Sequence, residues 1–197
     1  MITCYFGLPG CGKSTLLAKL ARTEIKRIEK GKSKYRMVLC NYYIEGCYQI
    51  DFSMIGSVDM SQCLILLDEI TLDADSRDFK DFAKRTKQFF ILHRHYDCDI
   101  IYVTQQYDGV DRKIRELTAN LFYMRKCGPL TYSTAIYRKI TIDQEGDIKM
   151  GYELPTLIKI FFDPKNNLRF VWRPRWYRYF DTKTAPPLQK VDFKKYE

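Results

Sequence analysis

Hydrophobic positions along the chain alternate between short continuous runs and longer stretches in which they recur at helical spacing. The continuous runs predict buried strands, because a parallel strand covered by helices is apolar on both faces. The recurring pattern predicts helices with one buried side. Strands are expected at 2–6, 36–40, 63–67, 99–106 and 120–124, and helices at 16–28, 73–95 and 110–117. This order predicts a three-layer α/β domain with a mostly parallel central sheet.

The pattern changes from Tyr132 onward, where apolar segments that alternate or run continuously are separated by turn residues. Such segments predict antiparallel strands added at one edge of the sheet. They lie at 135–142, 158–162 and 168–172, whereas 41–60 mixes tyrosines with glycines and predicts irregular or edge-strand structure. We expect a single domain over 1–197, with a core at 1–130, added β-strands at 131–180 and a basic tail at 181–197.

Composition adds a compartment and a class of partner. The net charge of +9 indicates a polyanionic partner or an anionic membrane surface. The seven cysteines are scattered singly and odd in number, so we expect buried thiols in a reducing, cytoplasmic compartment. The longest apolar runs are too short to cross a bilayer, and a soluble protein is expected.

A glycine-rich segment follows the first predicted strand and precedes the first predicted helix. It spells Gly, four residues, then Gly-Lys-Ser, the pattern of a nucleotide-binding phosphate loop. Its glycines allow backbone N–H groups to turn inward around phosphates, while the lysine reaches the outer phosphates and the serine hydroxyl binds Mg²⁺. The expected nucleotide-binding residues are Gly7, Leu8, Pro9, Gly10, Cys11, Gly12, Lys13, Ser14 and Thr15.

An acidic pair at the end of a predicted strand completes the predicted chemistry. The apolar run 63–67 ends in Asp68 and Glu69. An aspartate at the end of such a strand can hold the Mg²⁺ of the phosphate loop, together with Ser14. The glutamate beside it can orient and deprotonate an attacking water. We therefore predict an ATP and Mg²⁺ site with Lys13 and Glu69 as catalytic residues.

The next strand ends in polar residues, and its position decides their role. If it lies between the strand of the phosphate loop and the strand ending at Asp68, Gln105 can contact the terminal phosphate or the water. His93, His95 and Cys98 form a possible ligand cluster before it. Because a fourth ligand is not apparent, no zinc is expected; His93 is assigned to packing or partner contact and His95 to the solvent.

Cations and aromatic residues are interleaved in the segment 170–180. Two interpretations stay open. Such a mixture can stack on bases and neutralise phosphates, as in proteins that bind single-stranded nucleic acid. It is equally consistent with an aromatic strand that packs on the core and leaves its arginines in solvent.

Taken together, these motifs resemble the N-terminal ATPase domain of the zonular occludens toxin (Zot-like) family, the filamentous-phage assembly ATPases related to FtsK/HerA DNA-pumping motors. The resemblance covers most of the chain. Besides the phosphate loop and the Asp68-Glu69 strand, it rests on His93-Arg94-His95 followed by Thr104-Gln105, and on Tyr179-Phe180-Asp181-Thr182.

The resemblance implies a ring-forming homo-oligomer that couples ATP hydrolysis to extrusion or packaging of single-stranded phage DNA. It implies a location in the cytoplasm, at the cytoplasmic face of the host inner membrane, and association with membrane assembly proteins. Ring ATPases often complete a neighbour's site with an arginine, for which Arg115 or Arg125 is a candidate. Family members commonly continue into a transmembrane helix and an external domain; this sequence has neither, which puts direct membrane insertion in doubt.

Two other functions share the phosphate loop. A small-molecule kinase would carry an arginine-rich lid and an acceptor pocket, whereas the arginine-rich stretch here lies in a strand-like tail. A nucleotide-gated scaffold would need no catalytic carboxylate, and Asp68 and Glu69 are both present. The sequence therefore favours hydrolysis.

Overall fold

The computed structural model describes residues 1–70, 79–142, 148–153 and 169–181. The strands are β1 (Ile2–Phe6), β2 (Met37–Cys40), β3 (Tyr48–Gln49), β4 (Cys63–Asp68), β5 (Asp99–Thr104), β6 (Asn120–Cys127), β7 (Leu130–Ile142), β8 (Ile148–Glu153) and β9 (Arg169–Trp172). The α-helices are α1 (Lys13–Glu29), α2 (Phe79–Leu92) and α3 (Arg112–Leu117). Short 3₁₀ turns cover Phe52–Met54, Tyr107–Gly109, Arg173–Arg175 and Tyr177–Tyr179.

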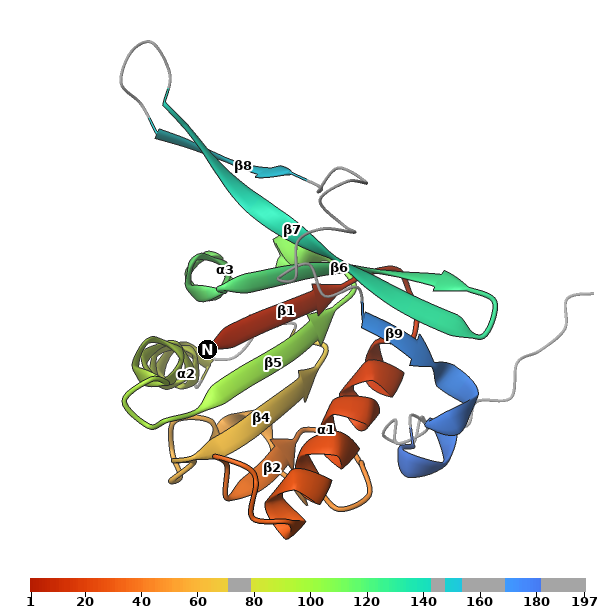
Figure 1. Ribbon diagram of the computed structural model, residues 1–197. Helices are drawn as coiled ribbons and strands as arrows, with labels where there is room; N and C mark the ends of the chain where they lie inside the picture. The colour runs from red at the N-terminus through yellow and green to blue at the C-terminus, as the bar shows by residue number, and fades with distance from the viewer. Residues whose placement is uncertain (71–78, 143–147, 154–168, 182–197) are drawn as a thin grey trace, which may run out of the picture.

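One sheet organises the molecule (Figure 1). Its order is β3-β2-β4-β5-β1-β6-β7-β8, with β9 paired to β7 beside this path. The pairs from β3 through β6 are parallel, which confirms the predicted mostly parallel sheet. The carboxyl ends of β1, β4 and β5 therefore meet at one edge, where parallel α/β sheets bind their ligands.

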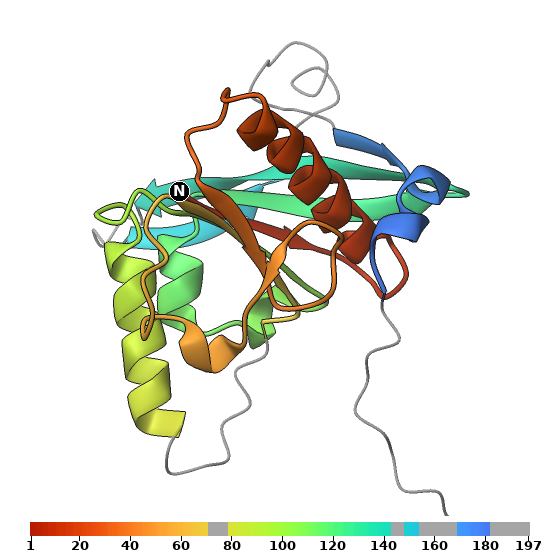
Figure 2. The ribbon, with the colours of Figure 1, turned by 90° about the horizontal axis from the view of Figure 1, so that it is seen from below.

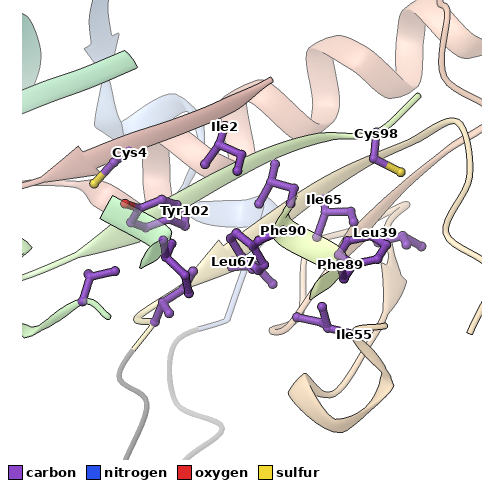
Figure 3. Packing of buried hydrophobic residues seen from close by; sticks show 14 of the residues in the cluster. Ile2, Cys4, Leu39, Ile55, Ile65, Leu67, Phe89, Phe90, Cys98 and Tyr102 are labelled. Carbon is purple, nitrogen blue, oxygen red and sulfur yellow. The ribbon is translucent and has the colours of Figure 1, made fainter. Parts of the chain in front are cut away.

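Helices cover both faces of the sheet, as predicted. Figure 2 shows α1 on one face and α2 with α3 on the other. On the first face, Leu16, Leu17 and Ala21 of α1 pack on inward-facing strand residues. On the second, Phe89 and Phe90 of α2 belong to a cluster with side chains of the central strands, among them Ile65, Leu67 and Tyr102 (Figure 3). Because both faces are buried, the strands read as continuous apolar runs.

The C-terminal strands form the predicted antiparallel edge. Strand β7 pairs antiparallel with β6, and then with β9 at one end and β8 at the other. Strand β6 continues beyond the predicted 120–124 to Cys127, so only Gly128 and Pro129 connect it to β7. The strand expected at 158–162 and the tail 182–197 lie outside the described residues.

Residues 169–181, which we call the strap, run from their pairing with β7 to the segment that follows β2. Beyond Trp172 the strap is not strand-like, contrary to the prediction, but forms two 3₁₀ turns. Its end bonds to the segment after β2, where Phe180 forms a bridge with Ile44 and the Glu45 N–H donates to the Tyr179 carbonyl at 2.9 Å. Trp176 and Phe180 pack on the α1 side of the core.

The histidine and cysteine side chains differ in burial and in their hydrogen bonds. His93 is buried and its Nδ1 lies 2.7 Å from the Phe90 carbonyl oxygen, whereas His95 is exposed. The Cys98 thiol donates to the Met60 carbonyl at 2.6 Å. All seven cysteines are free, as expected, and five are buried, whereas Cys47 is half-buried and Cys127 is exposed. Among the described helices, each is too short or too polar to span a membrane.

Candidate nucleotide-binding site

The phosphate loop connects β1 to α1 and is shaped by positive-φ glycines. Gly10 has φ 71° and Gly12 has φ 95°, which are left-handed conformations that glycine adopts without a Cβ penalty. The Cys11 N–H donates to the Leu8 carbonyl at 3.2 Å, and the Leu16 N–H to the Gly12 carbonyl at 3.0 Å as α1 begins. The loop therefore ends at a helix N-terminus, which favours anionic ligands.

Position 7 requires glycine because of close packing rather than because of its backbone angle. A Cβ at this position would lie 2.6 Å from the Met124 backbone oxygen of β6. The Gly7 N–H donates to the Thr104 carbonyl at the end of β5, at 3.3 Å. The start of the loop is thus anchored to both strands that flank β1.

The side chain of Lys13 lies back across the loop and is buried. Its ammonium group donates to the Gly7 carbonyl at 2.8 Å and to the Leu8 carbonyl at 3.3 Å. These bonds hold the positive charge over the loop, which is the position that phosphate recognition requires.

The loop and β4 meet through a direct contact. The Ser14 hydroxyl donates to Asp68 Oδ2 at 2.6 Å, although the two residues are far apart in sequence. Burial raises the pKa of Asp68, the hydrogen bond from Ser14 opposes this, and the nearby charge of Glu69 adds to the rise. A proton therefore competes more effectively for this carboxylate, which opposes the binding of a cation there as the pH falls.

The donor set fits Mg²⁺. A hydroxyl and a carboxylate oxygen, both hard ligands, lie together beside the phosphate loop. Mg²⁺ is typically held by one or two protein oxygens plus phosphate oxygens and water. No cluster of three or more histidine, cysteine, aspartate or glutamate side chains suited to a metal occurs in the described part of the chain.

Glu69 directly follows β4 and has an unusual backbone. Its φ is 53°, in the left-handed region that non-glycine residues seldom adopt. Such conformations concentrate at functional sites, where the surrounding structure over-determines them. Glu69 is half-buried and directly follows Asp68 at the carboxyl edge of the sheet.

The strand that precedes Gln105 has the position in the sheet that its predicted role requires. Strand β5 lies between β1 and β4. Gln105 follows Thr104, the last residue of β5, whose carbonyl accepts the Gly7 N–H. Gln105 is exposed at the edge that carries both the loop and Asp68. Its contact with phosphate or water stays a prediction.

The two candidate trans arginines lie on α3 and on β6. Arg115 of α3 pairs with Asp108 at 3.0 Å, and its guanidinium carbon lies 5.8 Å from the Tyr107 ring centroid. Arg125 of β6 is exposed, with its guanidinium carbon 5.0 Å from the Tyr123 ring centroid. A role for either in a neighbour's site stays a prediction.

The structure adds two residues that the sequence analysis missed. The Asn41 amide donates to the Asp68 carbonyl at 2.8 Å and accepts from the Asp68 N–H at 2.7 Å. The Tyr42 hydroxyl donates to the Ser14 carbonyl at 2.9 Å. Both follow β2, the strand next to β4. The available signal was a polar pair at the end of an apolar strand, in a segment predicted as irregular or edge-strand structure.

Asn41→Ala is expected to misplace Asp68, because it leaves that residue's N–H and C=O without their side-chain partner. We expect a loss of about 1–3 kcal/mol in unfolding free energy and a raised Mg²⁺ requirement for activity. Denaturant unfolding and a Mg²⁺ titration of phosphate release measure the two effects. Gln49→Ala, at an exposed amide on β3, is the control; an unchanged Mg²⁺ requirement in Asn41→Ala would contradict the assignment.

A phosphate loop on a parallel sheet, with a serine-to-aspartate contact and a following glutamate, defines the class of P-loop ATPases. Residues 7–145 match the family model for zonular occludens toxin (Zot), which is most of the chain. The protein therefore belongs to the Zot family. No curated protein sequence matches it.

Two solved structures are similar to this chain. The N-terminal domain of zonular occludens toxin from Neisseria meningitidis is 16% identical, with a TM-score of 0.51 over 80% of this chain and 96% of that one. The DNA-packaging ATPase of Sulfolobus Turreted Icosahedral Virus is 12% identical, with a TM-score of 0.43 over 79% of this chain and 98% of that one. The first match shows a shared P-loop fold.

Proposed function

We propose that this protein is an Mg²⁺-dependent ATPase motor that moves single-stranded DNA during phage assembly. The observation that carries the ATPase part is the contact of 2.6 Å between Ser14 and Asp68 at the phosphate loop, with Glu69 immediately after it. Membership of the Zot family supports the DNA-moving part. The protein acts as a homo-oligomer, a ring, at the cytoplasmic face of the inner membrane with membrane assembly proteins.

The residues divide the reaction between binding and proton transfer. The loop N–H groups and Lys13 bind the phosphates, while Ser14 and Asp68 hold Mg²⁺. Bound Mg²⁺ neutralises charge on the phosphate oxygens. Glu69 accepts the proton of the attacking water, and Gln105 orients that water. ATP and water give ADP and phosphate.

An aromatic sheet face supports single-stranded DNA as the partner. Val171 of β9 is buried toward α1, so Phe170 and Trp172 project from the opposite face. They are 49% and 54% exposed. The Phe170 ring lies 6.5 Å from that of Tyr132 on β7, whose partner on β6 is Arg125.

This surface, formed by Arg125, Tyr132, Phe170 and Trp172, is the aromatic face. Bases can stack on exposed rings without regard to sequence, and the arginine adds attraction for phosphate. The net charge of +9 favours a polyanion over the whole molecule.

The combined variant Phe170→Ala/Trp172→Ala is expected to weaken single-stranded DNA binding by roughly tenfold or more, because each stacked base contributes about 1–3 kcal/mol. Its ATP hydrolysis without DNA should stay unchanged. Fluorescence anisotropy with a labelled oligonucleotide measures the affinity at fixed salt. Tyr48→Ala removes an equally exposed ring (61%) at the far edge of the sheet and serves as the control; equal loss in both variants would contradict a role for the aromatic face.

The function is tested by phosphate release from MgATP across a range of protein concentrations, with and without single-stranded DNA and without another acceptor. Specific activity that rises with protein concentration, and again with DNA, is the expected result for an oligomeric motor. ATP binding without hydrolysis under all these conditions would overturn the motor and favour a kinase or a nucleotide-gated scaffold.

A further inference from the structure

The side chain of Arg173 reaches the phosphate loop from the strap, although it lies far away in the sequence. Its Nη1 donates to the Gly10 carbonyl at 3.2 Å and its Nε to the Pro129 carbonyl at 3.3 Å, while Nη2 donates to the Gly128 carbonyl. The guanidinium therefore links the loop to the β6–β7 turn. Its backbone N–H also donates to the Pro129 carbonyl, at 3.1 Å.

Thr131 of β7 holds the next peptide of the loop. Its hydroxyl is fully buried and donates to the Cys11 carbonyl at 2.6 Å. A Cβ on Gly12 would lie 2.5 Å from the Thr131 Oγ1 and 2.8 Å from the Arg173 Cδ. The antiparallel edge and the strap thus press closely against the outside of the loop, and Gly12 leaves the room for it.

These bonds fix the direction of two loop peptides. In a planar trans peptide the C=O and the following N–H point in opposite directions. The Thr131 bond on the Cys11 carbonyl therefore turns the Gly12 N–H to the other side of the loop. The Arg173 bond on the Gly10 carbonyl likewise directs the Cys11 N–H toward the Leu8 carbonyl, which it reaches at 3.2 Å. Because the Leu8 carbonyl already accepts the Cys11 N–H, the Gly12 N–H is the one of these two donors that is turned toward a phosphate.

We propose that Arg173 is a positioning residue for the nucleotide. It holds the phosphate loop in its binding shape from outside, and Thr131 assists it. Each of its named side-chain bonds ends on a backbone carbonyl, which is the pattern of a loop support. Nucleotide affinity is consequently linked to the seating of β9 on β7, the strands that carry the aromatic face. This inference rests on the proposed function only in taking ATP as the ligand.

The test compares Arg173→Ala with Arg175→Ala, which removes an exposed arginine of the same 3₁₀ turn whose guanidinium lies over Trp176. We expect Arg173→Ala to weaken binding of a fluorescent ATP analogue by about 10- to 100-fold, with kcat at saturating ATP changed less than about threefold. Arg173→Lys, which can still reach one carbonyl, should recover part of the affinity, and Arg175→Ala should match the unsubstituted protein.

Hydrogen exchange of the ligand-free protein gives a readout independent of activity. Arg173→Ala should accelerate exchange of the amides in 10–12, while the amides of β4 keep their protection and show that the variant is folded. Unchanged affinity in the folded variant would overturn the positioning role. If kcat then fell strongly, Arg173 would instead act on the reacting phosphates. If the unsubstituted protein binds the analogue but does not hydrolyse ATP, the motor fails while the Arg173 result still stands; absence of binding overturns both.

Discussion

Glu69→Gln is expected to bind MgATP with nearly unchanged affinity and to release phosphate about 10²- to 10⁴-fold more slowly. Glutamine has the shape of glutamate but cannot accept the proton of the attacking water. The side chain lies outside the Ser14–Asp68 contact, so nucleotide and Mg²⁺ binding should persist. Single-turnover phosphate release and equilibrium binding of a fluorescent ATP analogue separate the two properties.

The control for this variant is Glu29→Gln, at an exposed residue ending α1. It should hydrolyse ATP at the unsubstituted rate. Because Glu69 has φ 53°, the backbone conformation must also be shown to survive, for which an unchanged unfolding midpoint suffices. Normal turnover by Glu69→Gln would remove Glu69 from the mechanism.

Lys13→Ala is expected to lose most nucleotide binding and, with it, hydrolysis. A charge-assisted hydrogen bond is worth about 1.5–3 kcal/mol, so its loss alone lowers the affinity roughly 10- to 150-fold. Lys13 also donates to the Gly7 and Leu8 carbonyls, and their release should loosen the loop further. Titration with the fluorescent analogue measures the affinity, and phosphate release at high ATP measures what activity remains.

Lys13→Met separates the charge from the packing, because methionine keeps an apolar stem in this buried position. Both variants should bind poorly if the ammonium group is responsible. Lys26→Ala, at an exposed lysine in the last turn of α1, should bind normally. Retained affinity in Lys13→Met would show that the loop amides suffice for binding.

Local patterns carried the prediction of the core. The spacing of Gly7, Gly12 and Lys13, between an apolar strand and a helical repeat, identified the phosphate loop because each residue acts through its own backbone or side chain. Asp68 was identifiable because it ends a continuous apolar run, which marks a buried parallel strand. The antiparallel edge followed from the changed pattern after Tyr132.

Other residues act through partners that are distant in the chain. Asn41 matters because β2 lies beside β4, which gives its amide both backbone groups of Asp68. Arg173 lies in a segment where cations and aromatic residues are interleaved. From the sequence, both base stacking and packing on the core remained open as roles for that segment. In the strap, Val171 is buried in the core while Phe170 and Trp172 are exposed, and base stacking on these two rings stays a prediction.

The sequence by itself determined the class of the domain, the phosphate loop and the acidic pair, because strand, loop and helix propensities and the loop chemistry are short-range properties. The tertiary structure decided that β5 lies between β1 and β4, that Asn41 clamps Asp68, and that Arg173 and Thr131 support the loop. These contacts depend on strand order and on how the chain returns after β7. Strand order is set by the packing of the whole sheet, which periodicity along the chain does not record.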